Sequence, residues 1–331
     1  MRRAHLVLAA VLVFQLVVIA LLAAPWSGEQ VADRGALLVP DLAAKTPDRI
    51  AIETGEGERV ELARTDAGWT LPEVDGYPVD DKRVDELLDA LEQVRVRRPV
   101  VSSARYHERL EVADGKFQKR LRVWAGGDEP IADLYFGTSP QYQVQHVRRA
   151  GEDAVYEARG LASWQLRTRA DGWVDKHLVD VPVERVARVE LTNASGSLAL
   201  VRDGEQGWRL DGGPAVDEDK ADALVRQLAS LWISRPVGRR DDVKHGFAEP
   251  AARWVLVVTP EDAGDEDGSG DEGAGEAAGA KEPERITVLV GREDDGDRLV
   301  TREGFGYTAA VSPSSVEKAL TASVSSLAAG S

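Results

Sequence analysis

The chain has 331 residues, of which 43% are hydrophobic and 30% are charged, and this length suits about two domains. Its formal net charge of -16 argues against a nucleic-acid-binding protein, because a phosphate backbone would be repelled. The complete lack of cysteine excludes disulfides, iron–sulfur clusters, thiolate zinc sites and cysteine nucleophiles.

An uncharged apolar run follows Arg2 and Arg3 and covers residues 6–24. As a helix, its 19 residues would span about 29 Å, which is close to the thickness of the hydrocarbon core of a bilayer. A cleaved signal peptide is the alternative, but the run is long and Pro25 directly follows the best cleavage motif. We therefore predict an uncleaved signal-anchor transmembrane helix at residues 1–26, with the two arginines in the cytoplasm and the remaining chain outside it.

The remaining sequence contains a long segment that occurs twice. Residues 79–100 match residues 216–237 without a gap, and eight of the 22 paired positions are identical. Just upstream, residues 68–71 match residues 207–210, with a glycine and a tryptophan at the same places. This internal repeat predicts two tandem homologous units of one fold.

The pattern of apolar residues in each copy predicts several strands, then one main amphipathic helix and then further strands. Asp80 and Asp217 are good N-cap residues, because an aspartate side chain accepts hydrogen bonds from the free N–H groups at a helix start. Trp69 and Trp208 fall on short strands, where we expect their rings in the core. The apolar residues at helical spacing are Val84, Leu87, Leu88, Leu91 and Val94 in the first copy and Ala221, Leu224, Val225, Leu228 and Leu231 in the second.

The second group of strands completes an α+β fold, because no β-α-β alternation is visible. We expect these strands at residues 121–123, 134–136, 144–147 and 155–156 and at residues 254–258, 286–290, 298–301 and 307–311. A short helix is expected to close each copy, at residues 161–166 and 314–327. The predicted organisation is an anchor (1–26), a linker (27–47), a first unit (48–166), a connector (167–184) and a second unit (185–331).

An acidic stretch rich in glycine interrupts the second copy at residues 261–284. Residues 135–137 resemble residues 289–291, which lie 154 positions further along the chain, whereas the matched helices are only 137 positions apart. The second copy therefore contains about 17 additional residues at this point. The residues at the spacing of an EF-hand calcium loop are Asp265, Asp267, Ser269 and Glu276. No amphipathic helix flanks this weak metal candidate, and like charges repel, so we predict a solvated, disordered insertion.

Arginines follow the helix of each copy. Arg98 and Arg235 occupy matched positions, and Arg97, Arg239 and Arg240 lie close to them in the sequence. Guanidinium groups bind carboxylate or phosphate through two parallel hydrogen bonds, so Arg98 and Arg235 are candidates for contact with an anion or a partner. A charged sheet edge that prevents strand-to-strand aggregation is the alternative that we favour.

The remaining polar residues give no catalytic arrangement. Residues 80–81 and 217–219 hold paired carboxylates that could serve acid–base chemistry, but each pair starts a helix, where capping accounts for it. The five histidines are scattered, and the sequence has no nucleophile elbow, P-loop or dinucleotide fingerprint. We therefore predict no catalytic residue and no cofactor.

These features together resemble a known bacterial family. The strand pair before residues 68–69, the helix start at 79–80 and the strand end at 136–137, with their counterparts in the second copy, are similar to the uncharacterised family DUF4340. The resemblance covers nearly all of the chain beyond residue 45. It implies an accessory envelope protein, since members are encoded beside ABC-type transport genes of the gliding-motility type, and it supplies no catalytic residues. The acidic insertion departs from the family pattern.

The sequence therefore favours a non-catalytic binding or scaffold protein. Residues 6–24 would anchor it in the bacterial inner membrane as a single-pass protein, with its C-terminal part in the periplasm and with ABC transporter subunits or other envelope proteins as partners. An envelope polysaccharide or peptidoglycan hydrolase is the alternative, and it requires converging carboxylates. A calcium-responsive module that uses the acidic insertion is the third hypothesis.

Overall fold

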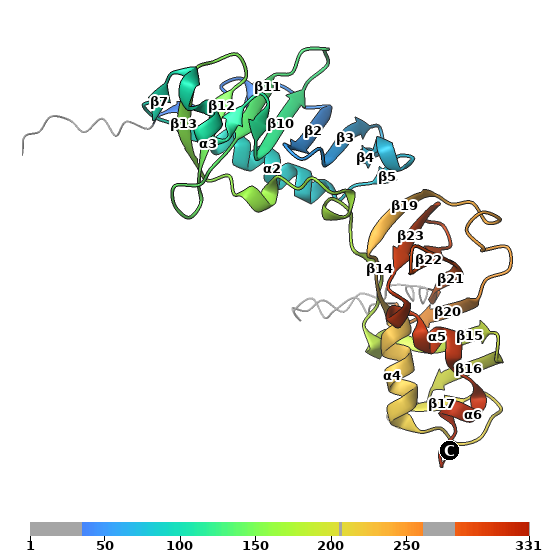
Figure 1. Cartoon of the computed structure of the whole chain (residues 1–331). Helices are drawn as coiled ribbons and strands as arrows, with labels where there is room; N and C mark the ends of the chain where they lie inside the picture. Colours follow the sequence, from blue (N-terminus) through green and yellow to red (C-terminus); the bar gives the residue numbers. More distant parts are fainter. Residues whose placement is uncertain (1–34, 205–206, 261–281, 331) are drawn as a thin grey trace, which may run out of the picture.

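The computed structural model describes residues 35–204, 207–260 and 282–330. The predicted anchor at residues 1–26 lies outside these residues. Among the residues that are described, no helix is long and apolar enough to cross a membrane. The described chain is β-rich with few helices, as expected for an α+β protein, and it forms two units that follow one another along the sequence (Figure 1).

The first unit is built on a sheet of nine strands, all antiparallel to their neighbours. In sheet order the strands are Tyr77–Pro78 (β5), Gly68–Leu71 (β4), Arg59–Thr65 (β3), Arg49–Thr54 (β2), Lys119–Trp124 (β10), Ala132–Phe136 (β11), Val144–Arg149 (β12), Ala154–Arg159 (β13) and Val101–Ser102 (β7). Every strand predicted for the first copy is therefore present in one sheet.

The second unit is built on a sheet of eight antiparallel strands. In sheet order these are Trp208–Leu210 (β17), Gly196–Arg202 (β16), Val186–Asn193 (β15), Ala252–Val258 (β20), Glu284–Asp294 (β21), Asp297–Arg302 (β22), Tyr307–Val311 (β23) and Arg235–Arg239 (β19). The predicted acidic insertion falls in the connection between β20 and β21, where residues 261–281 lie outside the described chain.

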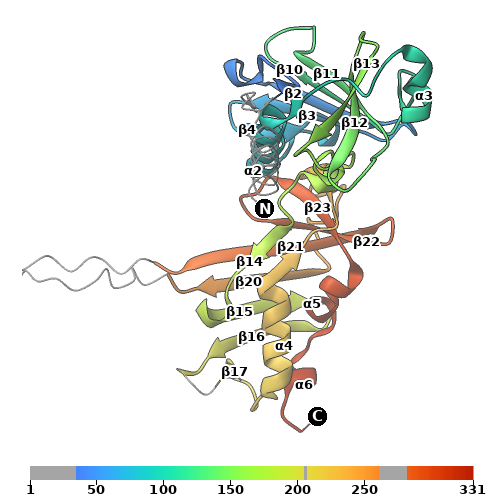
Figure 2. The same cartoon turned by 90° about the vertical axis from the view of Figure 1, so that its left-hand side faces the viewer.

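Short sheets and helices complete the two units. The two-stranded sheets are Ala36–Leu37 (β1) with Arg95–Val96 (β6), His177–Asp180 (β14) with Ser230–Trp232 (β18), and Val112–Ala113 (β8) with Lys116–Phe117 (β9). The α-helices are Asp81–Gln93 (α2), His107–Leu110 (α3), Glu218–Ala229 (α4), Glu317–Thr321 (α5) and Val324–Leu327 (α6). The long helix of each unit, α2 or α4, lies along one face of its sheet (Figures 1 and 2).

The two sheets share one strand order. The order β4-β3-β2-β10-β11-β12-β13-β7 in the first sheet corresponds strand by strand to β17-β16-β15-β20-β21-β22-β23-β19 in the second. The long helix enters at the same point, before the edge strand β7 or β19. One strand, β5, has no counterpart in the second sheet, and it is the strand that contacts the second unit.

The predicted helix starts are confirmed. Asp80 accepts a hydrogen bond from the backbone N–H of Lys82 at 3.3 Å, and Asp217 accepts one from Lys220 at 3.2 Å. The apolar stripes face inward, and their fully buried members include Val84, Leu87, Leu91, Ala221, Leu224 and Leu228. Since burying one such aliphatic side chain contributes about 1.5–3 kcal/mol for the larger residues, these stripes hold each helix against its sheet.

A matched pair of glycines lies directly after strand β11, at Gly137, and within strand β21, at Gly291, where the pairing of β21 with β22 shifts its register. A Cβ on Gly137 would lie 2.0 Å from the carbonyl oxygen of Leu110, and a Cβ on Gly291 would lie 2.0 Å from the carbonyl oxygen of His245. No side chain fits at that distance from a backbone oxygen. Both glycines therefore have the same structural reason, which is the close passage of a neighbouring backbone segment.

Burial confirms the expected core and extends it. Trp69 and Trp208 are each only 4% exposed, as predicted for core residues. Leu38 and Leu42, in the segment that we assigned to a linker, are fully buried, so the first unit packs against residues upstream of 48. Trp173, within the predicted connector, is fully buried as well. This segment is packed between the units and does not cross open solvent.

The closing helices are shorter than predicted. Residues 161–166 contain only the 3-10 turn Ser163–Gln165, and residues 314–327 are split into α5 and α6. The break has a local cause, because Ala322 is extended and the Ser323 side chain then accepts a hydrogen bond from Ser326 N–H to cap a new helix. One continuous helix at 314–327 was therefore wrong.

Candidate functional site

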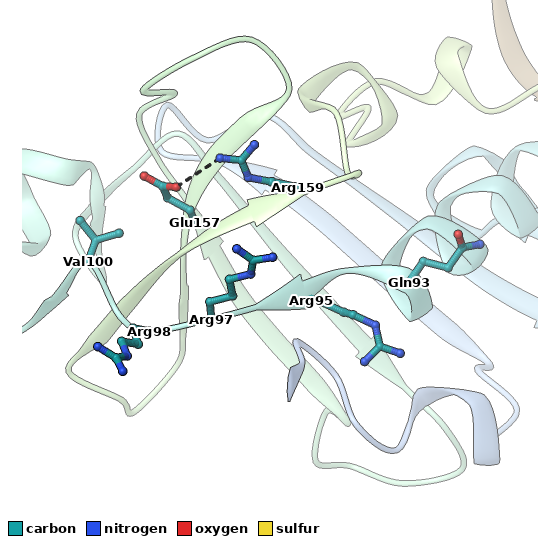
Figure 3. A pocket seen from close by; sticks show the side chains of 7 residues that line it. All are labelled: Gln93, Arg95, Arg97, Arg98, Val100, Glu157 and Arg159. Carbon is teal, nitrogen blue, oxygen red and sulfur yellow. Dashed lines mark ion pairs between the residues drawn. The ribbon is translucent and has the colours of Figure 1, made fainter. Parts of the chain in front are cut away.

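The main candidate site is a pocket beside the free end of strand β13. After α2 the chain passes through β6, which pairs with β1 and contacts β13, and then reaches the edge strand β7. A pocket of about 590 Å³ lies along this path. We call it the arginine pocket, and its lining residues are Gln93, Arg95, Arg97, Arg98, Val100, Glu157 and Arg159 (Figure 3).

The arginine pocket is positively charged within a strongly acidic protein. Four arginines line it against one glutamate, whereas the whole chain carries a net charge of -16. Figure 3 shows Arg97 reaching toward Glu157 and Arg159, which form a loose ion pair of 3.8 Å. Because like charges repel when they are gathered in one place, this clustering costs free energy that a bound anion would recover.

Most of this positive charge has no internal counter-ion. Arg95 donates from Nη1 to the carbonyl oxygen of Gly35 at 3.3 Å, which leaves its charge uncompensated. Among the described residues, no carboxylate lies within 4.0 Å of the Arg97 or Arg98 guanidinium. Both side chains are exposed, so their N–H groups are available to a ligand. The arrangement suits a carboxylate or phosphate group, which accepts two hydrogen bonds from each guanidinium fork.

The other predicted arginine, Arg235, has a different environment. It lies on the edge strand β19 and pairs with Asp294 at 3.0 Å and with Asp297 at 3.8 Å. The hydrogen bond from Arg235 holds the pKa of Asp294 below its ordinary value, so this pair stays ionised. The structure therefore does not bring Arg98 and Arg235 into one site, because each lies at the edge of a different sheet.

Two residues of the arginine pocket escaped the sequence analysis. Arg95 lies just after α2. The repeat marks Arg98, which has a matched arginine in the second copy, and does not mark Arg95. Arg159 lies at the end of β13, and the packing of β13 against β6 and β7 brings it near the segment that follows α2. No local pattern marks such a residue, since its role depends on a contact between distant parts of the chain.

The other sequence candidates do not form a site in the described structure. Asp265, Asp267, Ser269 and Glu276 lie outside the described residues. Within the described ranges, no group of three or more histidines or carboxylates is close enough to hold a metal ion. The paired carboxylates at the helix starts act locally, and Asp81 also accepts a hydrogen bond from the backbone N–H of Trp69 at 3.0 Å.

The two units meet through aromatic rings. The ring of Tyr77 on β5 lies 5.6 Å from that of Phe305 and 5.3 Å from that of Tyr307. Burial raises the pKa of the Tyr77 hydroxyl, and the negative charge of Asp175 raises it further. A pocket of about 230 Å³ lies beside this contact and is smaller than a typical ligand site. We therefore regard the contact as structural.

Comparison with known proteins gives one match. A family model described as "Domain of unknown function (DUF4340)" matches residues 69–250, from the first-unit strand β4 to a point before β20. No curated protein and no solved structure matches the chain. The matched region covers more than half of the chain and includes both long helices and the arginines that follow them. The chain is therefore a member of the DUF4340 family.

Proposed function

We propose that this protein is a membrane-tethered, extracytoplasmic binding or scaffold module that carries two tandem copies of one α+β unit and is accessory to an ABC-type transport system. The arginine pocket is the observation that carries the proposal. A built cluster of exposed guanidinium groups on an acidic protein suits recognition of an acidic group on a partner. The partner class follows from the family resemblance and the predicted anchor.

The duplication is supported by details that reach beyond strand order. Gly137 and Gly291 meet the same kind of backbone obstruction at positions that the repeat matches. Asp80 and Asp217 cap the matched helices. Two unrelated sheets would have no reason to share a cap, a glycine contact and a complete strand order. We infer that a single ancestral unit was copied and that the second copy then gained the acidic insertion.

The tether would keep the arginine pocket close to the membrane. Gly35, the first described residue, accepts a hydrogen bond from Arg95 of the pocket. Only eight residues separate Gly35 from the predicted anchor at residues 1–26, and at full extension they reach about 26–29 Å. A pocket held within this distance of the bilayer meets the outer faces of membrane subunits at high effective concentration.

The carboxyl groups support binding more than hydrolysis. Each aspartate with a clearly shifted pKa among the described residues has that pKa lowered. These are Asp114, Asp171, Asp211, Asp242 and Asp294. A glycoside hydrolase needs the opposite, a carboxylic acid whose pKa is raised so that it can donate a proton. No observation of the described chain favours the hydrolase alternative.

Affinity capture from membranes tests the proposal. The full-length protein is solubilised in a series of mild detergents, captured, and its co-purifying proteins are identified by mass spectrometry. We expect subunits of an ABC transporter with the natural sequence and their loss with the double variant R97E/R98E. R64E/R109E is the matched control, since both arginines are exposed, lie outside the pocket and give the same change of charge. Recovery of the protein without any transport subunit in every detergent would refute the proposal.

A further inference from the structure

The first unit carries a second cavity that the proposed function does not use. A groove of about 770 Å³ lies where the connection between β11 and β12 meets the turn after β13. We call it the glutamine groove, and its lining residues are Lys119, Ser139, Gln141, Tyr142, Gln143, Gln145, Ala162, Ser163 and Trp164. None of them lines the arginine pocket, so the two cavities are separate.

Two aromatic side chains stand exposed at this groove. Tyr142 is 89% exposed and Trp164 is 63% exposed, which is unusual because such rings normally bury most of their surface. Arg167 lies over the Trp164 ring, with its guanidinium carbon 5.4 Å from the ring centre. The ring is thus supported in place while much of it faces solvent. Exposed aromatic rings in a cavity provide flat apolar platforms for a ligand.

A buried amide lies at the same groove. Gln145 on β12 is only 6% exposed, and its side chain forms no hydrogen bond with any described residue. The amide atoms of Gln145 are not among the buried unpaired atoms of the described chain, which are Arg122 Nε and Trp254 Nε1, so the amide reaches the solvent of the groove. A glutamine amide that lines a cavity without a partner offers one acceptor and two donor hydrogens to a ligand. This amide therefore adds a polar contact to the two exposed rings that line the groove.

A tight turn presents two further glutamines. Gln141 forms an isolated bridge with Val144, whose backbone N–H donates to the Gln141 carbonyl oxygen at 3.2 Å. Gln143 has a left-handed backbone with φ of 56°, which closes the turn and holds Tyr142 at its tip. The three amides and the tyrosine ring therefore occupy one short segment whose geometry is set before any ligand arrives.

The groove is close to electrically neutral. Its one charged lining residue, Lys119, donates from Nζ to the carbonyl oxygens of Ser163 at 2.7 Å and Leu166 at 2.6 Å. These bonds fasten the turn that carries Trp164 and occupy most of the hydrogen-bonding capacity of the ammonium group. No carboxylate lines the groove among the described residues. The groove thus contrasts with the arginine pocket in charge and in chemistry.

We propose that the glutamine groove binds a neutral oligosaccharide. A sugar ring has an apolar face that stacks on Tyr142 or Trp164, and its hydroxyl groups both donate and accept, as the amide of Gln145 does. A nucleic acid would bring phosphates to a protein of net charge -16. An extended peptide needs a free strand edge, whereas β12 is paired on both sides. The lack of a lining carboxylate makes this a binding site without hydrolysis.

Calorimetric titration of the detergent-solubilised full-length protein tests this site. The probes are N-acetylchitotetraose, cellotetraose and maltotetraose. Each is titrated up to about 10 mmol/L, because weak binding is detected only at a high ligand concentration. We expect at least one to bind, with an affinity that salt changes little because the ligand carries no charge. Y142A and W164A should each weaken binding about three- to tenfold, and Q145M about five- to tenfold.

Matched variants separate this site from general damage. Tyr142 and Trp164 are exposed, so their removal leaves the core intact, and thermal unfolding monitored by circular dichroism checks this. W232A is the control, since Trp232 is also an exposed tryptophan, 55% accessible, but lies in the second unit. Failure of all three tetrasaccharides to bind, or binding that Y142A, W164A and Q145M leave unchanged, would overturn the proposal. Neither outcome bears on the arginine pocket, which R97E/R98E tests separately.

Discussion

The edges of the two sheets differ in charge although the sequence matches them. Arg98 in the first unit is exposed and lines a pocket with three other arginines. Arg235, at the matched position of the second unit, is neutralised by Asp294 and Asp297. These two aspartates flank the turn between β21 and β22, far from Arg235 in the sequence. The comparison teaches that arginines at matched positions can lie in opposite environments, because the surrounding acids decide whether each can meet a ligand.

The largest expected effect comes from reversing the charge of the open edge. Calorimetric titration with pyrophosphate should show binding to the natural protein, and R97E/R98E should weaken it by at least about a hundredfold, because two charge-assisted interactions of about 1.5–3 kcal/mol each are lost. R64E/R109E controls for overall charge and should retain most of the affinity. Equal loss in both double variants would show that net charge, rather than the arginine pocket, determines binding.

The neutralised edge allows the converse experiment. D294N/D297N removes both counter-ions of Arg235 without changing side-chain size. If the acids alone distinguish the two edges, this variant should gain a second, weaker pyrophosphate site that the additional change R235Q abolishes. A single site in D294N/D297N would mean that the clustering of four arginines, rather than one freed guanidinium, is required.

The third prediction concerns a feature that the two units share. G137A and G291A should each destabilise the protein by about 1–3 kcal/mol, because the new methyl group would press on a backbone carbonyl oxygen in a packed interior. Chemical denaturation measures the change. G115A and G127A are matched controls, since a Cβ at either position meets nothing within 4 Å. A loss of stability for only one of the two variants would indicate that the two glycine positions are not equivalent.

Local patterns predicted the elements well. The helical spacing of Val84, Leu87 and Leu91 is visible within one short stretch of sequence, and the capping residue Asp80 belongs to the same stretch. The same holds for the strands, which follow from short alternating runs in both copies. Burial of Trp69 could also be predicted, because its large ring lies on a short strand next to an amphipathic helix. The apolar face of that helix is the one apolar surface that the ring can cover.

The candidate sites could be predicted only in part. Arg98 was found through the repeat, but Arg159 joins it through strand pairing across more than fifty residues. Tyr142 and Trp164 line one groove only because β13 returns the chain to the connection before β12. Contacts of this kind depend on tertiary structure, for which the sequence carries no local signal.

The smallest expected effect compares two buried histidines that contact a threonine hydroxyl. His245 in the second unit lies 2.8 Å from Thr308 Oγ1, and His146 in the first lies 2.9 Å from Thr138 Oγ1. Burial lowers the pKa of His245, and nearby Lys244 lowers it further. The unfolded chain, whose histidines titrate near pH 6.5, therefore binds more protons below that pH than the folded one does.

The stabilising contribution of His245 is thus fully present above about pH 6.5 and is lost as the pH falls below it. Denaturant unfolding at pH 7.5 and pH 5.5 should show a smaller acid loss of stability in H245N than in the natural protein, since asparagine keeps an acceptor near the Nδ1 position but does not titrate. H146N is the control, because it measures how much stability is lost when a buried histidine that contacts a threonine is replaced. If H245N keeps the full acid dependence between pH 7.5 and pH 5.5, then His245 is not its source. The carboxylates held by arginine do not account for it either, because their pKa values are lowered from 3.8 and they are ionised in both the folded and the unfolded chain at pH 5.5.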